Sequence, residues 1–354
     1  MTLRAWGDVP YLPILSLRPA EMRALEELPN LTKDRLLPII HLRPWVGSHR
    51  LENATGRIAE AYGDRPVIIA MGDEPEPPNG RPVHAELGNL RDPSGGFRQW
   101  CEFFQANGNY IPAIQFALQV HDEEAQITRL FQLDRGLVVI IEAPAFPALA
   151  RIAQRVGERT QGGRAVCFVI DFGLAGRDHL EVAARAIGYI NTIRQHSPAS
   201  AISLSASSFP ESFVGLPKQL IYERRLFDTL PTRDGLIYSD RGSARVERQT
   251  GGGGQPAPRI DYPLLDQWRF YRSDDLTGFA GYQQQARVLK RQSIWNSNLR
   301  VWGTQMIERT AAGDTSAIGG PQKATAARIN LHLQRQAFYD APAAAENTDE
   351  DWSG

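Results

Sequence analysis

The sequence is poor in cysteine, since Cys101 and Cys167 are the only two in 354 residues. Such a chain does not indicate a disulfide framework, and both thiols are predicted to be reduced core residues. No apolar stretch approaches the roughly 20 residues that span a membrane, and the first residues show no signal-peptide pattern. We therefore expect a cytoplasmic protein with no membrane association.

Charge of one sign is also lacking, because 39 basic and 40 acidic residues leave a net charge of -1. The composition provides no general attraction to nucleic acid, so any polyanion site must be local. The chain contains no P-loop, glycine-rich dinucleotide fingerprint, GxSxG elbow or CxxC pair. Metal-ligand spacing such as HExxH is absent around His84, His121, His179, His196 and His332.

The sequence does contain a recurring unit, in which a short apolar strand ends in a polar residue and a helix follows. Its clearest examples are GLVVIIEAPAF and RAVCFVIDFGL, which place Glu142 and Asp171 at strand exits. Short runs rich in Val and Ile, separated by helix-length segments, are typical of a parallel sheet covered by helices. Eight such strands are predicted, and this number favours an α/β fold with a TIM-barrel-like (β/α)8 parallel barrel over an open sheet.

Composition predicts where the barrel ends. A glycine- and proline-rich stretch, RQTGGGGQPAPR, indicates a linker or loop, and the segment after it has helical spacing with clustered aromatics. The last residues are acidic and small, which predicts disorder. The expected organisation is a barrel over 1–247, a linker or loop over 248–259, a C-terminal α-rich extension packed on the barrel over 260–340, and a disordered acidic tail over 341–354.

Two segments carry more specific expectations. Residues 74–96 contain so much proline and glycine that an irregular loop is predicted, acting as a lid or a partner-binding loop. The segment KQLIYERRLFDTL, residues 218–230, is predicted to be a helix.

The order of several short motifs resembles a known family. YLPILSLRPAEMRALEEL, LLPIIHLRP, the SSFP turn, ERRLFDTL, YSDRGS and TAARINLHLQRQ are similar to the beta protein family of tailed phages, prophages and bacteria. The chain departs from the family pattern at His41, where an acidic residue is common, and at Arg241, where an aromatic residue is common. The resemblance implies a TIM-barrel-like domain with a C-terminal elaboration and a setting in phage biology or phage–host conflict.

The predicted strand exits bring together several titratable side chains. The carboxyl ends of TIM-barrel strands carry the active site in essentially every characterised enzyme of that fold. Converging carboxylates repel one another unless a cation, a proton or an arginine intervenes. Glu142, Asp171 and Asp240 are therefore candidate ligands of Mg²⁺ or Mn²⁺. The candidate catalytic residues are His41, Asp73, Glu142, Asp171 and Asp240.

The same acids also admit a structural interpretation, as caps of the following helices or partners of nearby arginines.

A phosphate site is predicted separately at the last two strand exits, SASSFP and SDRGS, because such loops often bind phosphate in barrels. Ligand-binding candidates around the strand exits are Arg43, Gln115, Ser205, Ser207, Ser208, Arg225, Arg241 and Gly242.

Together these features predict a barrel protein, associated with phages or antiviral defence, that binds a phosphate-containing ligand at the strand-exit face. A metal-dependent phosphodiesterase or nuclease is one form of this hypothesis. An alternative is a non-catalytic protein-interaction component of a phage–host conflict system. A third is single-stranded nucleic-acid binding through the aromatic and basic C-terminal part, which includes Trp268, Arg269, Arg272 and Trp302.

Overall fold

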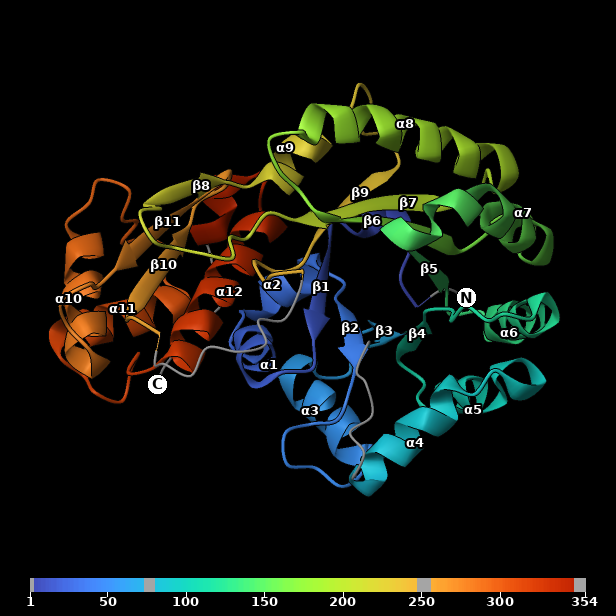
Figure 1. Ribbon diagram of the computed structural model, residues 1–354, viewed down its shortest axis with the longest axis horizontal. Coiled ribbons are helices and arrows are strands. Elements are labelled where there is room, and N and C mark those ends of the chain that lie inside the picture. Colours follow the sequence, from blue (N-terminus) through green and yellow to red (C-terminus); the bar gives the residue numbers. More distant parts are fainter. Residues whose placement is uncertain (1–2, 73–79, 247–255, 347–354) are drawn as a thin grey trace. The chain divides into compact units, whose positions relative to one another are not determined.

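A computed structural model describes residues 3–72, 80–246 and 256–346 (Figure 1). Asp73, most of the predicted linker and the end of the predicted tail lie outside these ranges. The chain divides into two compact units. Unit 1 comprises 1–17, 37–206 and 223–240, and unit 2 comprises 18–36, 207–222 and 241–354.

Unit 1 contains a nearly closed barrel of eight parallel strands, which confirms the predicted fold class. Around the barrel the order is β4-β3-β2-β1-β9-β7-β6-β5. A parallel bridge between Ala113 and Val138 joins the two end strands, and the Ile114 amide donates to the Val138 carbonyl at 3.0 Å. The strands are β1 (Tyr11–Ser16), β2 (Ile39–Leu42), β3 (Val67–Met71), β4 (Tyr110–Pro112), β5 (Leu137–Glu142), β6 (Val166–Leu174), β7 (Ala201–Ser207) and β9 (Leu236–Asp240).

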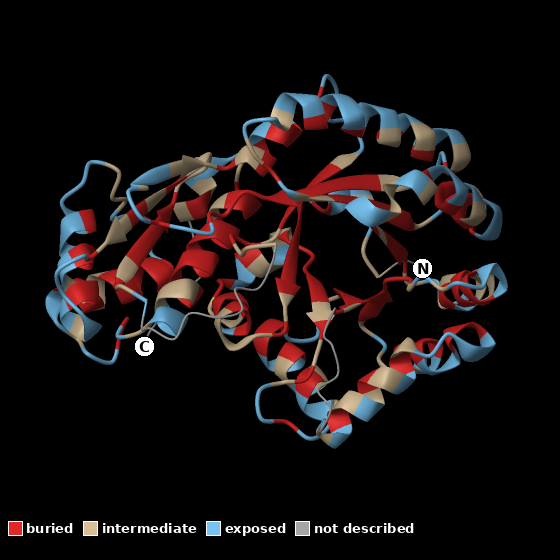
Figure 2. Ribbon diagram, viewed as in Figure 1, coloured by how far each residue is buried: buried red, intermediate tan, exposed pale blue. Residues whose placement is uncertain are grey.

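The barrel strands are apolar because they are covered on both sides. Leu12, Ile39, Ile68, Val138 and Val169 belong to one buried cluster, and the strands are largely buried in Figure 2. A central core of β-branched and leucine side chains is the usual filling of such a barrel. Its stability comes from this burial, at roughly 1.5–3 kcal/mol for each large apolar side chain.

Helices follow most of the strands and cover the barrel (Figure 1). Their bounds are α3 (Glu52–Tyr62), α4 (Pro82–Arg91), α5 (Ser94–Ala106), α6 (Val120–Gln132), α7 (Leu149–Arg159), α8 (His179–His196) and α9 (Tyr222–Asp228), with short 3-10 helices at Trp6–Asp8 and Ala143–Ala148.

The prediction of an irregular loop over 74–96 was wrong for its described part. Residues Pro82–Arg91 form α4, and α5 begins at Ser94. Proline stands at the first turn of α4, where its missing amide proton is no loss. Val83, Leu87 and Leu90 recur at helical spacing and are buried, so packing of this face outweighs the loop-like composition.

Unit 2 combines helices with a small antiparallel sheet. Its helices include α1 (Pro19–Glu26), α2 (Asn30–Arg35), α10 (Gly278–Lys290), α11 (Trp302–Ala312), α12 (Pro321–Ala337) and a 3-10 helix at Pro342–Glu346. The predicted C-terminal helices are confirmed. The sheet, in the order β10 (Arg259–Pro263), β11 (Gln267–Arg272) and β8 (Lys218–Leu220), was not predicted. Lys218–Leu220 is a strand, so the helix expected over 218–230 is limited to Tyr222–Asp228.

Helix α12 is the central element of unit 2. Most of its residues from Ala326 to Ala337 are buried, and polar ones among them are bonded to neighbouring elements. Asn330 donates to the Ala24 carbonyl at 3.0 Å, and Gln334 accepts a bond from the Thr32 hydroxyl at 2.6 Å. Within the described ranges, no helix is both long and apolar enough to cross a membrane.

Candidate functional site

A pocket of about 410 Å³ opens at the carboxyl ends of β2 to β5 in unit 1. It combines three predicted site residues with an arginine and an apolar wall. This is the strand-exit face on which TIM-barrel enzymes carry their sites. The pocket is lined by His41, Ala70, Met71, Gly72, Arg91, Phe97, Ile114, Gln115, Phe116, Ile140, Glu142, Pro144 and Ala145.

His41 and Glu142 are placed at this face by strand register. His41 lies beside Ala70 in the β2–β3 pair, and Glu142 is the last residue of β5. Both are half-buried at the ends of otherwise buried strands. Strand register therefore places one imidazole and one carboxylate at the pocket.

Gln115 is held by a set of hydrogen bonds. The Gln126 side chain accepts from the Gln115 amide at 2.7 Å and donates to its carbonyl at 2.9 Å. The Gln115 side chain donates to the Leu90 carbonyl at 2.9 Å. Arg91 follows Leu90 and donates to the Gly72 carbonyl at 2.7 Å. These contacts fix the wall formed by β4 and α4, as a pre-organised site requires.

The backbone beside the pocket carries strain. Phe97 is buried, lines the pocket and has a positive φ of 52°, after Gly95 and Gly96 with φ of 64° and 71°. A left-handed phenylalanine costs about 1–3 kcal/mol, and such strain concentrates at functional sites. Gly72 is required here for a different reason, because an added Cβ would lie 2.9 Å from the Leu42 carbonyl oxygen.

The two remaining described carboxylates do not line this pocket. Asp171 is buried and accepts a hydrogen bond from the Gly173 amide at 2.9 Å, which stabilises the local turn. Asp240 is fully buried and accepts from the Tyr11 and Tyr238 hydroxyls at 2.6 and 2.9 Å. Both carboxylates therefore stabilise the barrel through these contacts.

No group of three His, Cys, Asp or Glu side chains within the described residues is arranged to hold a metal ion. Each oxygen of Asp240 accepts a hydrogen bond from a tyrosine hydroxyl. A Mg²⁺ or Mn²⁺ site at Glu142, Asp171 and Asp240 stays a prediction.

Two of the three serine hydroxyls predicted to bind phosphate form hydrogen bonds within unit 2. Ser207 donates to the Ala244 carbonyl at 2.6 Å, and Ser208 accepts from the Tyr222 amide at 2.9 Å. Ser205 is buried, and its hydroxyl has no hydrogen-bond partner among the described residues. None of the three serines lines the described pockets in either unit.

The SDRGS segment forms a tight turn. The Ala244 amide donates to the Arg241 carbonyl at 2.8 Å, and the two central residues, Gly242 and Ser243, have φ of 57° and 60°. Positive φ at both central positions is typical of a type I′ turn, which favours glycine.

Arg43 is half-buried after β2, and Arg225 is exposed on α9. These ligand-binding assignments stay predictions.

Among the lining residues that the sequence did not single out are one arginine and two phenylalanines. They are Arg91 on α4, Phe97 on α5 and Phe116 in the segment after β4. Their location at the pocket depends on where these elements lie in the folded unit. The helical spacing of Val83, Leu87 and Leu90 was the available signal for α4.

Two of the aromatic residues considered for nucleic-acid stacking, Trp268 and Trp302, belong to the core of unit 2, whereas Tyr271 and Trp295 are half-buried. Trp268 is 0% exposed and Trp302 is 3% exposed, and Trp268 packs edge-on against Phe209 at 5.4 Å between ring centroids. Base stacking needs an accessible ring face, which neither residue offers.

Comparison with known proteins supports the family suggested by the short motifs. The family model described as Beta protein matches residues 11–338. The chain is 28% identical over 335 residues to "Protein beta" of Enterobacteria phage P4, and the match covers 92% of each chain. The similarity therefore includes both units.

Proposed function

The chain belongs to the Beta protein family, and we propose that its barrel mouth binds a small phosphate-bearing molecule. The observation that carries this proposal is the single pocket shared by His41, Arg91, Gln115 and Glu142. We place this binding in phage biology or phage–host conflict, because a similar protein is encoded by phage P4.

The polar side of the pocket suits an anionic ligand with further hydrogen-bonding groups. Arg91 is anchored through one guanidinium nitrogen to the Gly72 carbonyl, and a guanidinium offers five N–H donors in a planar fork. Phosphate accepts such paired donors well. Glu142 at the same pocket accepts hydrogen bonds from ligand hydroxyls.

The apolar side suits a planar or apolar part of the same ligand. Phe97 is buried in the wall, whereas Phe116 is 41% exposed. An exposed aromatic ring at a pocket gains apolar contact when a ring stacks against it. A nucleotide combines both features, so nucleotides are the first ligands to test.

Hydrolysis of the bound ligand is a further form of the proposal. His41 and Glu142 are the described lining side chains of the types that serve as general acids or bases in enzymes. If turnover occurs, Glu142→Gln is expected to abolish it while leaving binding in place. Assays with Mg²⁺, with Mn²⁺ and with a chelator determine whether turnover depends on a metal.

The binding proposal is tested by calorimetric titration with a panel of nucleoside mono-, di- and triphosphates. Arg91→Gln is expected to weaken binding about tenfold or more, the usual effect of losing a charged hydrogen bond. Phe116→Ala is expected to weaken binding several-fold. Arg151→Gln on the exposed surface of α7 and Leu118→Ala, at a fully exposed position, are the matched controls. Equal loss in test and control variants, or no binding by the wild type, would contradict the proposal.

A further inference from the structure

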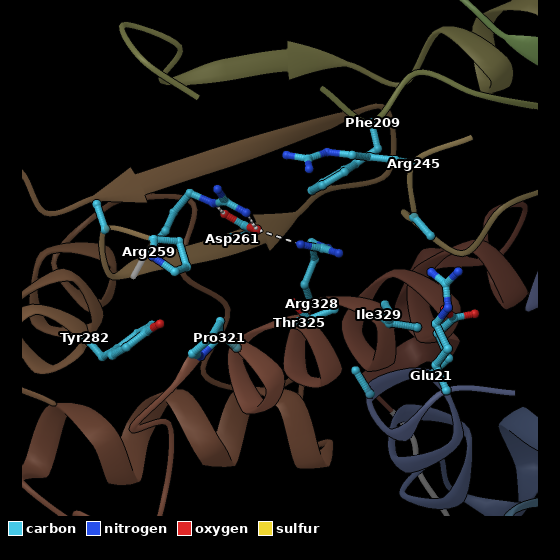
Figure 3. Close-up of a pocket in the computed structure, with 16 residues that line it drawn as sticks. Glu21, Phe209, Arg245, Arg259, Asp261, Tyr282, Pro321, Thr325, Arg328 and Ile329 are labelled. Atoms are coloured by element: carbon cyan, nitrogen blue, oxygen red, sulfur yellow. Dashed lines mark hydrogen bonds and ion pairs between the residues drawn. The ribbon is translucent and has the colours of Figure 1, made fainter. Parts of the chain in front are cut away.

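A second cavity, of about 380 Å³, lies within unit 2 and is rich in arginine (Figure 3). Its lining has four arginines and two acids, so basic groups are in excess. The charged lining residues are Arg18, Glu21, Arg245, Arg259, Asp261 and Arg328.

Secondary-structure periodicity brings these side chains together. Arg259 and Asp261 are two residues apart on β10 and therefore share one face of the strand. Thr325 and Arg328 recur at helical spacing along α12. Arg245 follows the tight turn at Arg241–Ala244. Figure 3 shows Arg259 and Arg328 approaching the Asp261 carboxylate from the strand and the helix respectively.

One carboxylate serves two of the guanidinium groups. Arg259 binds Asp261 in a bidentate manner, with its Nη2 atom 2.9 Å from Oδ2, and Arg328 Nη1 lies 3.0 Å from the same oxygen. Arg245 donates instead to the backbone carbonyls of Pro210 and Glu211, at 2.9 and 2.7 Å. The positive charge of this group of three arginines therefore exceeds the charge of Asp261.

Burial and the neighbouring arginines lower the pKa of two of these guanidinium groups. Burial lowers the pKa of Arg328 to about 10, with Arg259 and Arg245 adding to the decrease against the opposing effect of Asp261. Burial and then the neighbouring Arg259 also lower the pKa of Arg245. An anion between these groups would favour their charged forms.

Aromatic rings hold the guanidinium groups in place. The Arg328 guanidinium carbon lies 4.0 Å from the Phe209 ring centroid, and that of Arg259 lies 3.2 Å from the Phe213 centroid. Arg245 approaches the same Phe213 ring at 5.5 Å. Stacking on a ring orients an arginine through its face, while the N–H donors in its plane stay directed at other groups. The donors are thus ordered before a ligand arrives, which lowers the entropy cost of binding.

We propose that this arginine pocket binds a small molecule with a multivalent phosphate group, such as a diphosphate. The site is separate from the barrel mouth and does not depend on the proposed function, since all of its lining residues belong to unit 2. A pocket of this volume has room for a small phosphorylated molecule. Tyr282 and Thr325 in the lining provide hydroxyls for the rest of the ligand.

The experiment is a calorimetric titration of the full chain with inorganic pyrophosphate, and with inorganic phosphate as the weaker anion. Arg18→Gln and Arg245→Gln are the test variants, because Arg328 is buried and its removal endangers folding. Each is expected to weaken pyrophosphate binding about tenfold or more. Arg291→Gln, at an exposed position beyond α10, is the matched control and should leave binding unchanged. Circular dichroism and thermal melting confirm that each variant is folded.

Two further arms distinguish the arginine pocket from the barrel mouth and from a nucleic-acid surface. Arg91→Gln at the barrel mouth is expected to retain pyrophosphate binding. The proposal for the arginine pocket and the proposal for the barrel mouth are therefore tested independently. Loss of binding in Arg91→Gln, together with full binding in Arg18→Gln and Arg245→Gln, would overturn the assignment. Tight binding of a short single-stranded oligonucleotide that depends on Arg245, without pyrophosphate binding, would overturn the small-molecule proposal in favour of nucleic acid. Wild-type protein that binds neither phosphate nor pyrophosphate would overturn it as well.

Discussion

The Tyr11 hydroxyl donates a hydrogen bond of 2.6 Å to Oδ1 of Asp240, which lies 229 positions further along the chain. Tyr238 donates to the other oxygen of the same carboxylate, and the two tyrosine rings stack with their centroids 5.6 Å apart. Burial and the nearby Asp240 carboxylate raise the pKa of Tyr11 well above its ordinary value. The pKa of Tyr238 is raised as well, by burial and by Asp240, so both hydroxyls stay protonated as donors. The bond from Tyr11 joins the first barrel strand, β1, to the last, β9.

Tyr11→Phe is expected to destabilise unit 1 by about 2 kcal/mol, because a buried carboxylate loses one of its hydrogen-bond donors. Urea unfolding followed by fluorescence measures the change. Tyr189→Phe, in a half-buried tyrosine of α8, is the matched control and should change the free energy of unfolding by much less. An equal effect of the two substitutions would show that the bond to Asp240 contributes nothing specific.

Gly157→Ala is expected to destabilise the protein by roughly 1–3 kcal/mol, the usual cost of overpacking. A Cβ at this position in α7 would overlap the His196 carbonyl oxygen at the end of α8. Gly188→Ala on α8 is the control, since its Cβ would have no neighbour within 4 Å. This control should stabilise the helix by about 0.5–1 kcal/mol. Thermal melting that ranks the two variants in the opposite order would contradict the packing described for α7 and α8.

Asp261→Asn is expected to destabilise unit 2 by about 3 kcal/mol or more, because it leaves the buried Arg328 without its carboxylate. Asp274→Asn removes a carboxylate from Arg272, but in this pair the aspartate is exposed and the arginine is half-buried. Surface pairs contribute about 0–1 kcal/mol, so the second variant should be nearly neutral. Similar unfolding free energies for both variants would show that Asp261 is not needed to hold Arg328.

Asp314 is expected to contribute a pH-dependent part of the stability. Hydrogen bonds from Ser316 and Arg309 lower its pKa from 3.8 to about 2. Because the folded state favours the carboxylate, this contribution is complete above about pH 3.8 and is lost as the pH falls toward 2. The stability difference between wild type and Asp314→Asn should therefore shrink over this interval. Asp275→Asn is the control for removal of an exposed charge. A stability difference between wild type and Asp314→Asn that stays constant from pH 5 to 2 would contradict the prediction.

The barrel was readable from the sequence because parallel strands are buried on both faces and so appear as unbroken apolar runs. The strand β8 at Lys218–Leu220 was not, since it has three residues, polar composition and exposed or half-buried side chains. It exists because β11 pairs with it. Helix α4 was obscured by its proline- and glycine-rich surroundings, although its buried residues keep helical spacing.

One of the two candidate sites could be predicted from the sequence, and the other could not. Strand ends were sufficient to place His41, Gln115 and Glu142 at one mouth, because the carboxyl ends of parallel strands meet there. No local motif indicated the arginine pocket of unit 2. Its arginines come from four separate stretches of the chain, and only the folded unit brings them to one cavity.

Local apolar patterning, a property of neighbouring residues, thus specified the barrel and the positions of its strand-exit side chains. The environment of each side chain depended on residues far away in the chain. Glu142 lines a pocket, whereas Asp240, at an equivalent strand end, is buried under hydrogen bonds from Tyr11 and Tyr238. Hydrogen bonding and burial act between groups in space, so the tertiary structure decided which acid lines a pocket and which is enclosed by tyrosine hydroxyls.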